Sequence, residues 1–257
     1  MTEITTQPIR IFHLLPGVAA QELSQLPGAP PAQGFYWIAC TRTAFGNDLA
    51  RLQAMLQQLT GQQLVDLHVS DLLNTQLPSH YDYTTQYDLL VVRRLAQSQA
   101  PATAPLQHGA RGGPPVLRRI DTSPVGFAVF DQVLLSVHPE DCGVRDTYAA
   151  RLLTPQAGNA TPASAAEAVV RELRTGPVPG ARLPPSSADL MLRVVNHIVD
   201  SYLDLRRELS RQLDHWQAEL LRPRTRFANW GALMQARMAL HQLDEICEDQ
   251  RAAVRAW

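Results

Sequence analysis

The sequence contains no lysine, because all 23 residues counted as Lys or Arg are Arg. The chain therefore offers no lysine nucleophile and no phosphate-binding lysine of the P-loop type. Its net charge of −1 is close to zero, so electrostatics give no reason to expect binding to nucleic acid. We expect no nucleic-acid partner.

Cysteine is scarce, and its spacing excludes two kinds of site. Cys40, Cys142 and Cys247 lie far apart, and no two of them form a CxxC pair. This spacing argues against a disulfide framework and against a zinc site built from thiolates. Three isolated cysteines are typical of a protein in a reducing compartment.

Long apolar runs are also missing. The N-terminal residues 1–17 contain too short an apolar run, with the wrong flanks, for a signal peptide. No stretch approaches the roughly 20 apolar residues that a membrane-spanning helix needs. The residues given are therefore predicted to form a soluble segment in the cytoplasm.

The motifs of common enzyme classes are absent, since the sequence has no GxGxxG, Walker A, GxSxG or HExxH. The densest polar cluster, residues 138–141 (His-Pro-Glu-Asp), follows a predicted strand, and a solvated turn before a helix explains it best. Asp66 and His68 alternate with apolar residues, which predicts one solvated face of a short strand. We expect no enzyme, assign no catalytic residue and expect no bound cofactor.

The first two thirds of the chain read as strands interleaved with helices, followed by helices alone. Residues 16–33 read as a loop, and residues 62–74 as a short strand and then a short helix. This order predicts an α/β layer domain, within residues 1–180, with a helical extension. The predicted strands are 8–15, 34–40, 87–95, 116–121, 125–130 and 133–137. The predicted helices are 49–59, with Asn47 or Asp48 as its N-cap, 146–153 and 163–174.

Residues 186–257 read as two long antiparallel helices, with Ser186 or Ser187 as the N-cap and a break at Arg222-Pro223. Apolar residues recur at alternating spacings of three and four, which keeps one stripe of each helix facing a partner. The stripes are Val195, Ile198, Tyr202, Leu205, Leu209, Leu213, Trp216 and Leu220, then Leu233, Leu240, Cys247 and Val254 with Ala236, Leu243 and Trp257.

The second stripe reaches the last residue of the sequence without a stop signal. Trp257 is in register with the stripe, and no Gly, Asn or Pro precedes it to end the helix. We therefore expect the natural chain to continue beyond Trp257.

Two acidic rows on these helices are weak candidates for binding a divalent cation. Arginines lie within one turn of several members, so ion pairs along a solvated helix surface explain most of both rows. The candidates are Asp200, Asp204 and Glu208 in the first helix, and Asp244, Glu245, Glu248 and Asp249 in the second.

The order of these segments resembles the cytoplasmic domain of CorA-type divalent-metal transporters, including their zinc-transporter branch. At residues 76–80 the sequence keeps the proline of the family pattern but lacks the basic residues that stand beside it in the family. The family's Gly-Met-Asn triplet is also absent. The matching segments are Trp37-Ile38, residues 49–59, 64–74, 87–95, 127–130, 133–138, 191–214 (with Asp200, Tyr202 and Asp214) and 233–254.

The resemblance implies α/β/α layers around a mixed sheet, followed by long antiparallel helices that lead toward an absent stalk. It implies a regulatory domain that senses Mg²⁺, Co²⁺ or Zn²⁺ at protomer interfaces and gates a pore. The full-length protein would be a homopentamer held in the cell inner membrane by C-terminal helices, with this segment on the cytoplasmic side. Which cation is transported, and which residues bind it, stay open.

Two alternatives also stay open. The first is a soluble interaction protein whose helical hairpin, residues 186–257, docks a partner and has no role in transport. The second is an enzyme that uses the cleft near His138, which no motif supports.

Overall fold

The computed structural model describes residues 7–16, 19–96, 120–153, 183–221 and 230–257. The predicted helix 163–174 and the break at residues 222–223 lie outside the described residues. So do residues 116–119 of the predicted strand 116–121, whose last two residues are described but are not strand.

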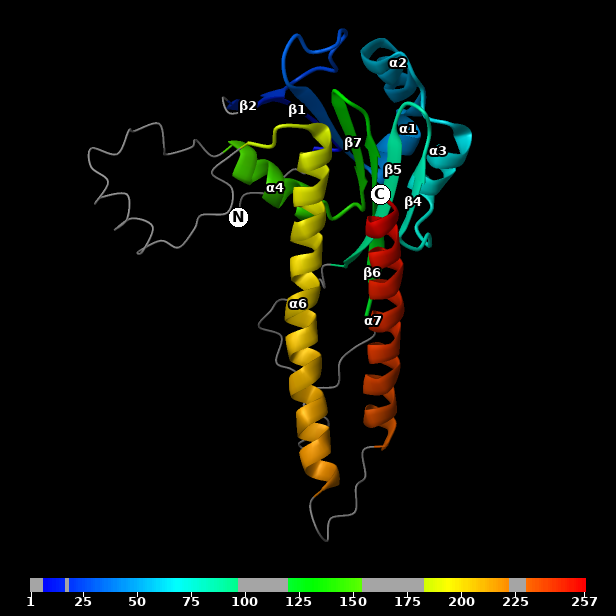
Figure 1. The fold of residues 1–257 in the computed structure, drawn as a ribbon, viewed down its shortest axis with the longest axis vertical. Coiled ribbons are helices and arrows are strands. Elements are labelled where there is room, and N and C mark those ends of the chain that lie inside the picture. Colours follow the sequence, from blue (N-terminus) through cyan, green and yellow to red (C-terminus); the bar gives the residue numbers. More distant parts are fainter. Residues whose placement is uncertain (1–6, 17–18, 97–119, 154–182, 222–229) are drawn as a thin grey trace, which may run out of the picture.

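Seven strands form one mixed sheet in the order β2-β1-β3-β7-β6-β5-β4 (Figure 1). The central neighbours β3 and β7 are parallel, and every other neighbouring pair is antiparallel. The strands are β1 (Ile9–Leu15), β2 (Ala19–Leu23), β3 (Phe35–Thr41), β4 (His80–Tyr83), β5 (Asp88–Leu95), β6 (Thr122–Val129) and β7 (Val133–His138).

The parallel pair is the most buried part of the sheet. All six residues of β7 are buried, as are six of the seven in β3. Strands covered on both faces need apolar residues at nearly every position, which is why both were recognisable as continuous apolar runs.

Three short helices cover one face of the sheet: α1 (Arg42–Asn47), α2 (Leu49–Thr60) and α3 (Asp66–Leu73). The apolar face of α2 joins a cluster with the alternate strand residues Ile38, Leu89 and Leu135. Glycine at position 126 of β6 lets α3 approach closely, because a Cβ there would lie 2.2 Å from Cδ2 of Leu72.

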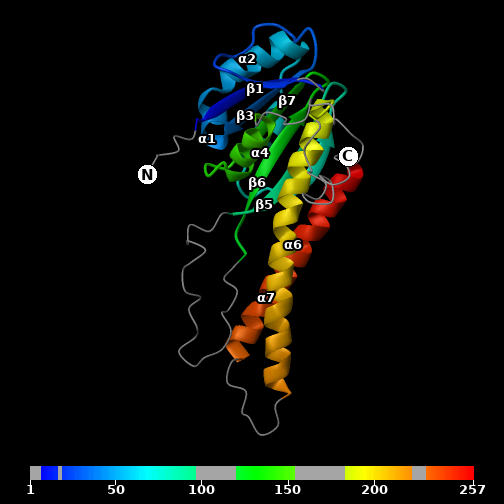
Figure 2. The ribbon, with the colours of Figure 1, turned by 90° about the vertical axis from the view of Figure 1, so that its left-hand side faces the viewer.

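The other face carries α4 (Gly143–Leu153) and two long helices, α6 (Ser187–Leu220) and α7 (Trp230–Ala256). Figure 2 shows α6 and α7 on the side of the strands opposite α1 and α2. Residues of α6 and α7, among them Val194 and Leu243, share one apolar cluster with Trp37 and Phe127 of the sheet. The layers are therefore α/β/α, as the resemblance implied.

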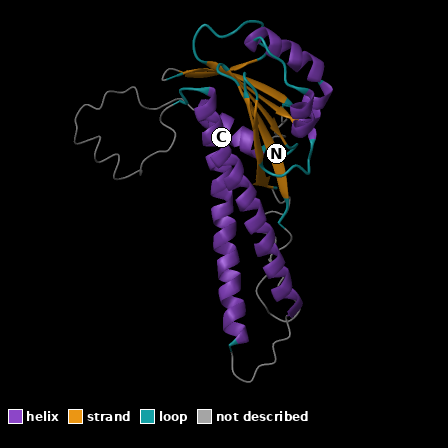
Figure 3. Ribbon diagram, turned by 45° about the vertical axis from the view of Figure 1, so that its right-hand side comes forward, coloured by secondary structure: helices purple, strands orange, loops and turns teal. Residues whose placement is uncertain are grey.

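The long helices are antiparallel, and each extends well beyond the sheet at one end (Figures 1 and 3). The N-terminal part of α6 and the C-terminal part of α7 lie against the strands. Ser186 caps α6, since its Oγ accepts a hydrogen bond from the amide of Asp189 at 3.2 Å.

The division of the chain into two domains, residues 1–180 and 186–257, stays a prediction. Among the described residues, no helix is long and apolar enough to cross a membrane.

Several local predictions were wrong. The loop predicted for residues 16–33 contains the edge strand β2, and the strand predicted before α3 does not form. Residues 80–83, to which no element was assigned, form a short edge strand, β4. Residues 42–47, which were not assigned, form α1. Asp48 occupies the N-cap position of α2, but its side chain makes no capping hydrogen bond.

The predicted stripe of α7 was half wrong. Ala236 and Leu243 are buried as predicted, but Leu240, Cys247 and Val254 are exposed. The positions that share the buried face are instead Ala239, Ile246 and Ala253. Apolar residues recur every seven positions along two neighbouring lines of α7, one through Leu240 and the other through Ala239. Contact with the sheet buries the line through Ala239 and leaves the line through Leu240 exposed.

Candidate functional site

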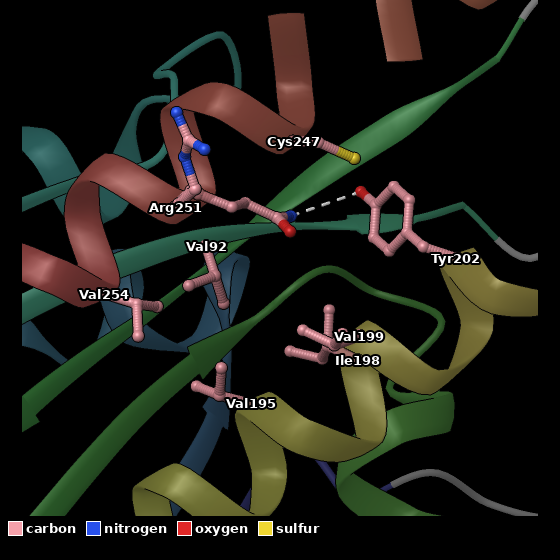
Figure 4. Close-up of a pocket in the computed structure, with 9 residues that line it drawn as sticks. Val92, Val195, Ile198, Val199, Tyr202, Cys247, Arg251 and Val254 are labelled. Atoms are coloured by element: carbon pink, nitrogen blue, oxygen red, sulfur yellow. Dashed lines mark hydrogen bonds between the residues drawn. The ribbon is translucent and has the colours of Figure 1, made fainter. Parts of the chain in front are cut away.

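A cavity of about 280 Å³ lies between the sheet-side parts of α6 and α7, with β5 as its floor. Figure 4 shows aliphatic side chains from all three elements along its wall. The lining residues are Val92 of β5, Val195, Ile198, Val199 and Tyr202 of α6, and Cys247, Gln250, Arg251 and Val254 of α7.

Tyr202 and Gln250 fasten the two helices to the sheet at one end of this cavity. The Tyr202 hydroxyl donates to the carbonyl oxygen of Arg93 at 2.7 Å, and Nε2 of Gln250 donates to the same oxygen. This carbonyl is available because β4 begins at His80, opposite Val91, so Arg93 lies beyond the paired stretch of that edge. Burial raises the pKa of Tyr202, so its phenol stays protonated.

The acidic row of α6 remains on the surface. Asp200 and Asp204 are exposed, and Asp204 accepts a hydrogen bond at 2.9 Å from the guanidinium of Arg207. This pair was predicted from the spacing. The side chain of Glu208 lies outside the described part of the structure.

The acidic row of α7 is also exposed, at Asp244, Glu245, Glu248 and Asp249. Glu248 pairs with Arg251 at 2.6 Å, and Glu245 lies 3.5 Å from Nε2 of His241. Within the described ranges, no group of three or more His, Cys, Asp or Glu side chains is placed to hold a metal ion.

In the polar cluster after β7, His138 is closed to solvent, whereas Glu140 and Asp141 are exposed. His138 is buried, and its Nε2 lies 2.9 Å from Oγ of Ser136, which accepts a hydrogen bond from the Trp37 indole. Burial, with the positive charges of Arg145 and Arg94, lowers the pKa of His138 to about 3. The imidazole is neutral at pH 7 and has no access to a substrate, so its geometry is that of a structural histidine.

The other members of this cluster hold the adjacent turns. Glu140 accepts a hydrogen bond from the amide of Thr43 at 3.0 Å, and Asp141 pairs with the buried Arg94. Arg145 is fully buried and pairs with Asp146 at 2.9 Å. Burial of these arginines was not predicted, because the sequence alone does not show which carboxylates they meet.

Asp66 and His68 do not share a strand face, because both lie in α3. His68 is buried between the Tyr87 hydroxyl, 2.8 Å from Nδ1, and the Asp82 carboxylate, 3.1 Å from Nε2. The hydrogen bond from His68 lowers the pKa of Asp82. The three residues join α3, β4 and the start of β5, and no sequence motif marks them.

No known protein-family profile matches the sequence, and no curated protein matches it. Solved structures do match. The cytoplasmic domain of ZntB from Vibrio parahaemolyticus RIMD 2210633 aligns with a TM-score of 0.55 and 15% identity, over 96% of this chain and 77% of that one. The full-length CmaX protein aligns with a TM-score of 0.53 and 11% identity, over 96% and 72% of the two chains.

A looser match, with a TM-score of 0.48 and 10% identity, is the soluble domain of CorA from Methanocaldococcus jannaschii, over 98% of this chain and 96% of that one. The fold assignment rests on the first two structures. Both align with this chain at a TM-score above 0.5, so the similarity is one of overall fold.

The structure is therefore an α/β/α domain with a long helical hairpin. More specifically, its fold is that of a CorA-like cytoplasmic domain. The resemblance drawn from the sequence is confirmed at the level of the fold.

Proposed function

We propose that this chain is the cytoplasmic regulatory domain of a CorA-like divalent-cation channel or transporter. It would sense intracellular Mg²⁺, Co²⁺ or Zn²⁺ at contacts between protomers, and its response would gate a pore. In this proposal the assembly is a homopentamer in the inner membrane, joined to it by helices outside the residues given. We assign no catalytic role.

The observation that carries this proposal is the exposed acidic row of α7. Its four carboxylates stand within six consecutive positions of one helix and include two adjacent pairs, Asp244-Glu245 and Glu248-Asp249. Like charges at this density repel one another unless a cation neutralises them. Mg²⁺ binds through one or two carboxylates and keeps several waters, so a cation at this row would have coordination positions left for a carboxylate of a second protomer.

The two hydrogen bonds to the carbonyl oxygen of Arg93 connect α7, which carries these carboxylates, to the sheet. Gln250 lies one residue beyond Asp249 and shares the Arg93 carbonyl with Tyr202 of α6. A cation that draws α7 toward a second protomer would therefore also displace α6 and β5, which are bonded to α7 through this carbonyl. A cation can shift such an equilibrium only by binding one arrangement more tightly, as a site between protomers does.

Sedimentation velocity of the 257-residue chain, in EDTA and in millimolar MgCl₂, tests the proposal. We expect Mg²⁺ to increase the oligomer. The double variant Glu245→Gln/Asp249→Asn should need about tenfold more Mg²⁺ for the same effect. The matched control Asp66→Asn/Asp131→Asn removes the same charge from exposed positions on other elements and should behave as the parent chain.

Two results would contradict cation sensing at this row. One is an oligomeric state that is the same in EDTA and in MgCl₂. The other is a double variant that responds to Mg²⁺ as the parent chain does. A stable oligomer that ignores divalent cations would instead favour the alternative, a helical-hairpin interaction protein.

A further inference from the structure

Two half-buried arginines lie at the end of the sheet where β6 extends past β7. Among the described residues, β6 pairs with β7 only from Gly126 onward, and its first residues pair with β5 alone. Arg42, the first residue of α1, donates from Nη2 to the carbonyl oxygen of Pro124 at 2.6 Å. Arg93 of β5 donates from Nη2 to the carbonyl oxygen of Thr122 at 2.9 Å. The two side chains therefore satisfy carbonyl groups that β7 does not reach.

These contacts place the two guanidinium groups side by side. Their acceptor oxygens belong to alternate residues of one strand, which point the same way and lie about 7 Å apart. A small oxyanion that accepts a hydrogen bond of about 2.8 Å from each side can bridge such a gap.

Neither guanidinium group forms an ion pair with a carboxylate among the described residues. Their remaining acceptors are all neutral: the carbonyl oxygen of Leu72 for Arg42, and for Arg93 the carbonyl oxygens of Thr75 and Leu77 and the hydroxyl of Thr122. A guanidinium group cannot lose its proton in a protein, so burial leaves the positive charge in place. An anion from solution would offset the cost of that burial.

The neighbouring carboxylates do not neutralise the pair. Glu140 accepts a hydrogen bond from a backbone amide at 3.0 Å, and Asp141 pairs with Arg94. Burial lowers the pKa of Arg42, the charge of Glu140 raises it, and the positive charges of Arg93 and Arg94 lower it again. Burial also lowers the pKa of Arg93. Three arginines and two carboxylates thus leave one positive charge in excess.

Arg42 also keeps donors for a ligand. Of its five N–H groups, Nε–H and one N–H of Nη2 are used, so three have no acceptor among the described residues. We propose that Arg42 and Arg93 together bind an oxyanion of the phosphate type, either free phosphate or a phosphomonoester group. The planar guanidinium fork matches two oxygens of such an anion, which a spherical anion such as chloride does not offer.

This site is connected to the hairpin through Arg93. The backbone carbonyl oxygen of the same residue accepts the hydrogen bonds of Tyr202 and Gln250. An anion held by the Arg93 side chain is therefore bound to the residue that joins α6 and α7 to the sheet. The proposal is independent of cation sensing, because neither arginine belongs to the acidic rows.

A phosphate titration of the whole chain, followed by ¹H–¹⁵N NMR, tests the proposal. All samples contain EDTA and have the same ionic strength. We expect saturable shifts of the amides of Thr43, Arg93 and Thr122 with sodium phosphate, and none with sodium chloride. Glycerol 3-phosphate distinguishes the two sources of the anion: tighter binding than phosphate indicates a phosphomonoester, and equal or weaker binding indicates free phosphate.

Arg42→Gln is the informative variant, and Arg51→Gln is its matched control. Both changes remove one positive charge, but Arg51 is exposed on α2 and lies outside this site. We expect Arg42→Gln to weaken phosphate binding by about tenfold and Arg51→Gln to leave it unchanged. Arg42→Lys keeps the charge without the fork and should lie between the two. Circular dichroism checks that each variant is folded, and Arg42→Lys decides if Arg42→Gln is not.

Three results would overturn the proposal. The first is the absence of a saturable shift with either phosphate compound. The second is an equal response to sodium chloride. The third is phosphate binding by Arg42→Gln, or by Arg42→Lys where only that variant folds, that equals binding by Arg51→Gln.

Discussion

The hairpin has a sheet-side half, residues 186–202 and 239–257, and a far half, residues 203–221 and 230–238. Both halves belong to α6 and α7, yet their surroundings differ. In the sheet-side half, Val194 and Ile198 are almost completely buried against the strands, and Tyr202 and Gln250 bond to β5. In the far half, Met234, Met238 and Trp230 are exposed. The same secondary structure is therefore part of the core at one end and projects into solvent at the other.

This difference shows that a helix as long as α6 or α7 is not uniformly stabilised. Most of the stability of a helix in a protein comes from packing of its apolar face. The sheet supplies that packing to one half only. Substitutions in the two halves should consequently have unequal effects, which the following predictions use.

The largest difference is expected between Ile198→Ala and Met238→Ala. Ile198 is 1% exposed, so its truncation should lower the free energy of unfolding by roughly 2–5 kcal/mol. Met238→Ala should change it by less than about 0.5 kcal/mol, because that side chain is in solvent. Urea unfolding of both variants measures the two values. Equal losses would contradict the division of the hairpin into two halves.

Acid should destabilise the sheet through His138. The pKa of this residue is lowered to about 3 in the folded chain, against an ordinary value near 6.5. Between these values the unfolded state binds the proton, so stability falls as the pH decreases, by at most about 1.4 kcal/mol per pH unit. Unfolding curves from pH 7 to pH 4 measure the slope.

His138→Gln is the control for this effect. The variant lacks the titrating group, so its stability should depend less steeply on pH over the same range, even if it is lower throughout. A slope identical to that of the parent chain would show that other groups cause the acid sensitivity.

Two glycines give a matched comparison of sheet and hairpin. Gly34 has φ of 75°, and a Cβ there would lie 2.0 Å from the Leu14 carbonyl oxygen, so Gly34→Ala should cost about 2 kcal/mol. Gly231, in the first turn of α7, has open space around it. Gly231→Ala should be neutral or stabilise by up to about 1 kcal/mol. Thermal unfolding compares them, and a stabilising Gly34→Ala would contradict this account.

Tyr202→Phe is expected to lower the free energy of unfolding by about 1 kcal/mol. It removes one hydrogen bond to Arg93 but leaves Gln250 bonded to the same carbonyl oxygen. The double variant with Gln250→Ala should lose more than the sum of the single changes, because the buried acceptor is then unpaired. Strict additivity in the denaturation data would show that the two residues do not share this role.

The strands and helices that sequence predicted correctly are those with strong apolar patterns. Four strands, β1, β3, β5 and β7, have long apolar runs, and α6 has a regular stripe and a serine cap. The edge strands β2 and β4 were missed because their residues are polar or half-exposed. Their extended conformation depends on pairing with a neighbour, such as Leu23 opposite Ile11, which local sequence does not reveal.

The candidate site was less predictable than the fold. Exposed carboxylates such as Asp244 were identified from sequence because helical spacing alone places them on a surface. The shared hydrogen bonds at Arg93 were not, since Gln250 is 157 positions away in sequence. The second apolar line on α7 was assigned to the core, whereas only tertiary packing shows that Leu240 and Val254 remain exposed.

Hydrogen exchange of amides along α6 and α7 in the whole chain tests the central claim, that the hairpin has a packed half and a projecting half. The account predicts protection close to the global free energy of unfolding at residues 190–202 and 243–253, and markedly lower protection at residues 210–220 and 230–238. Equal protection along the full length of both helices would contradict it.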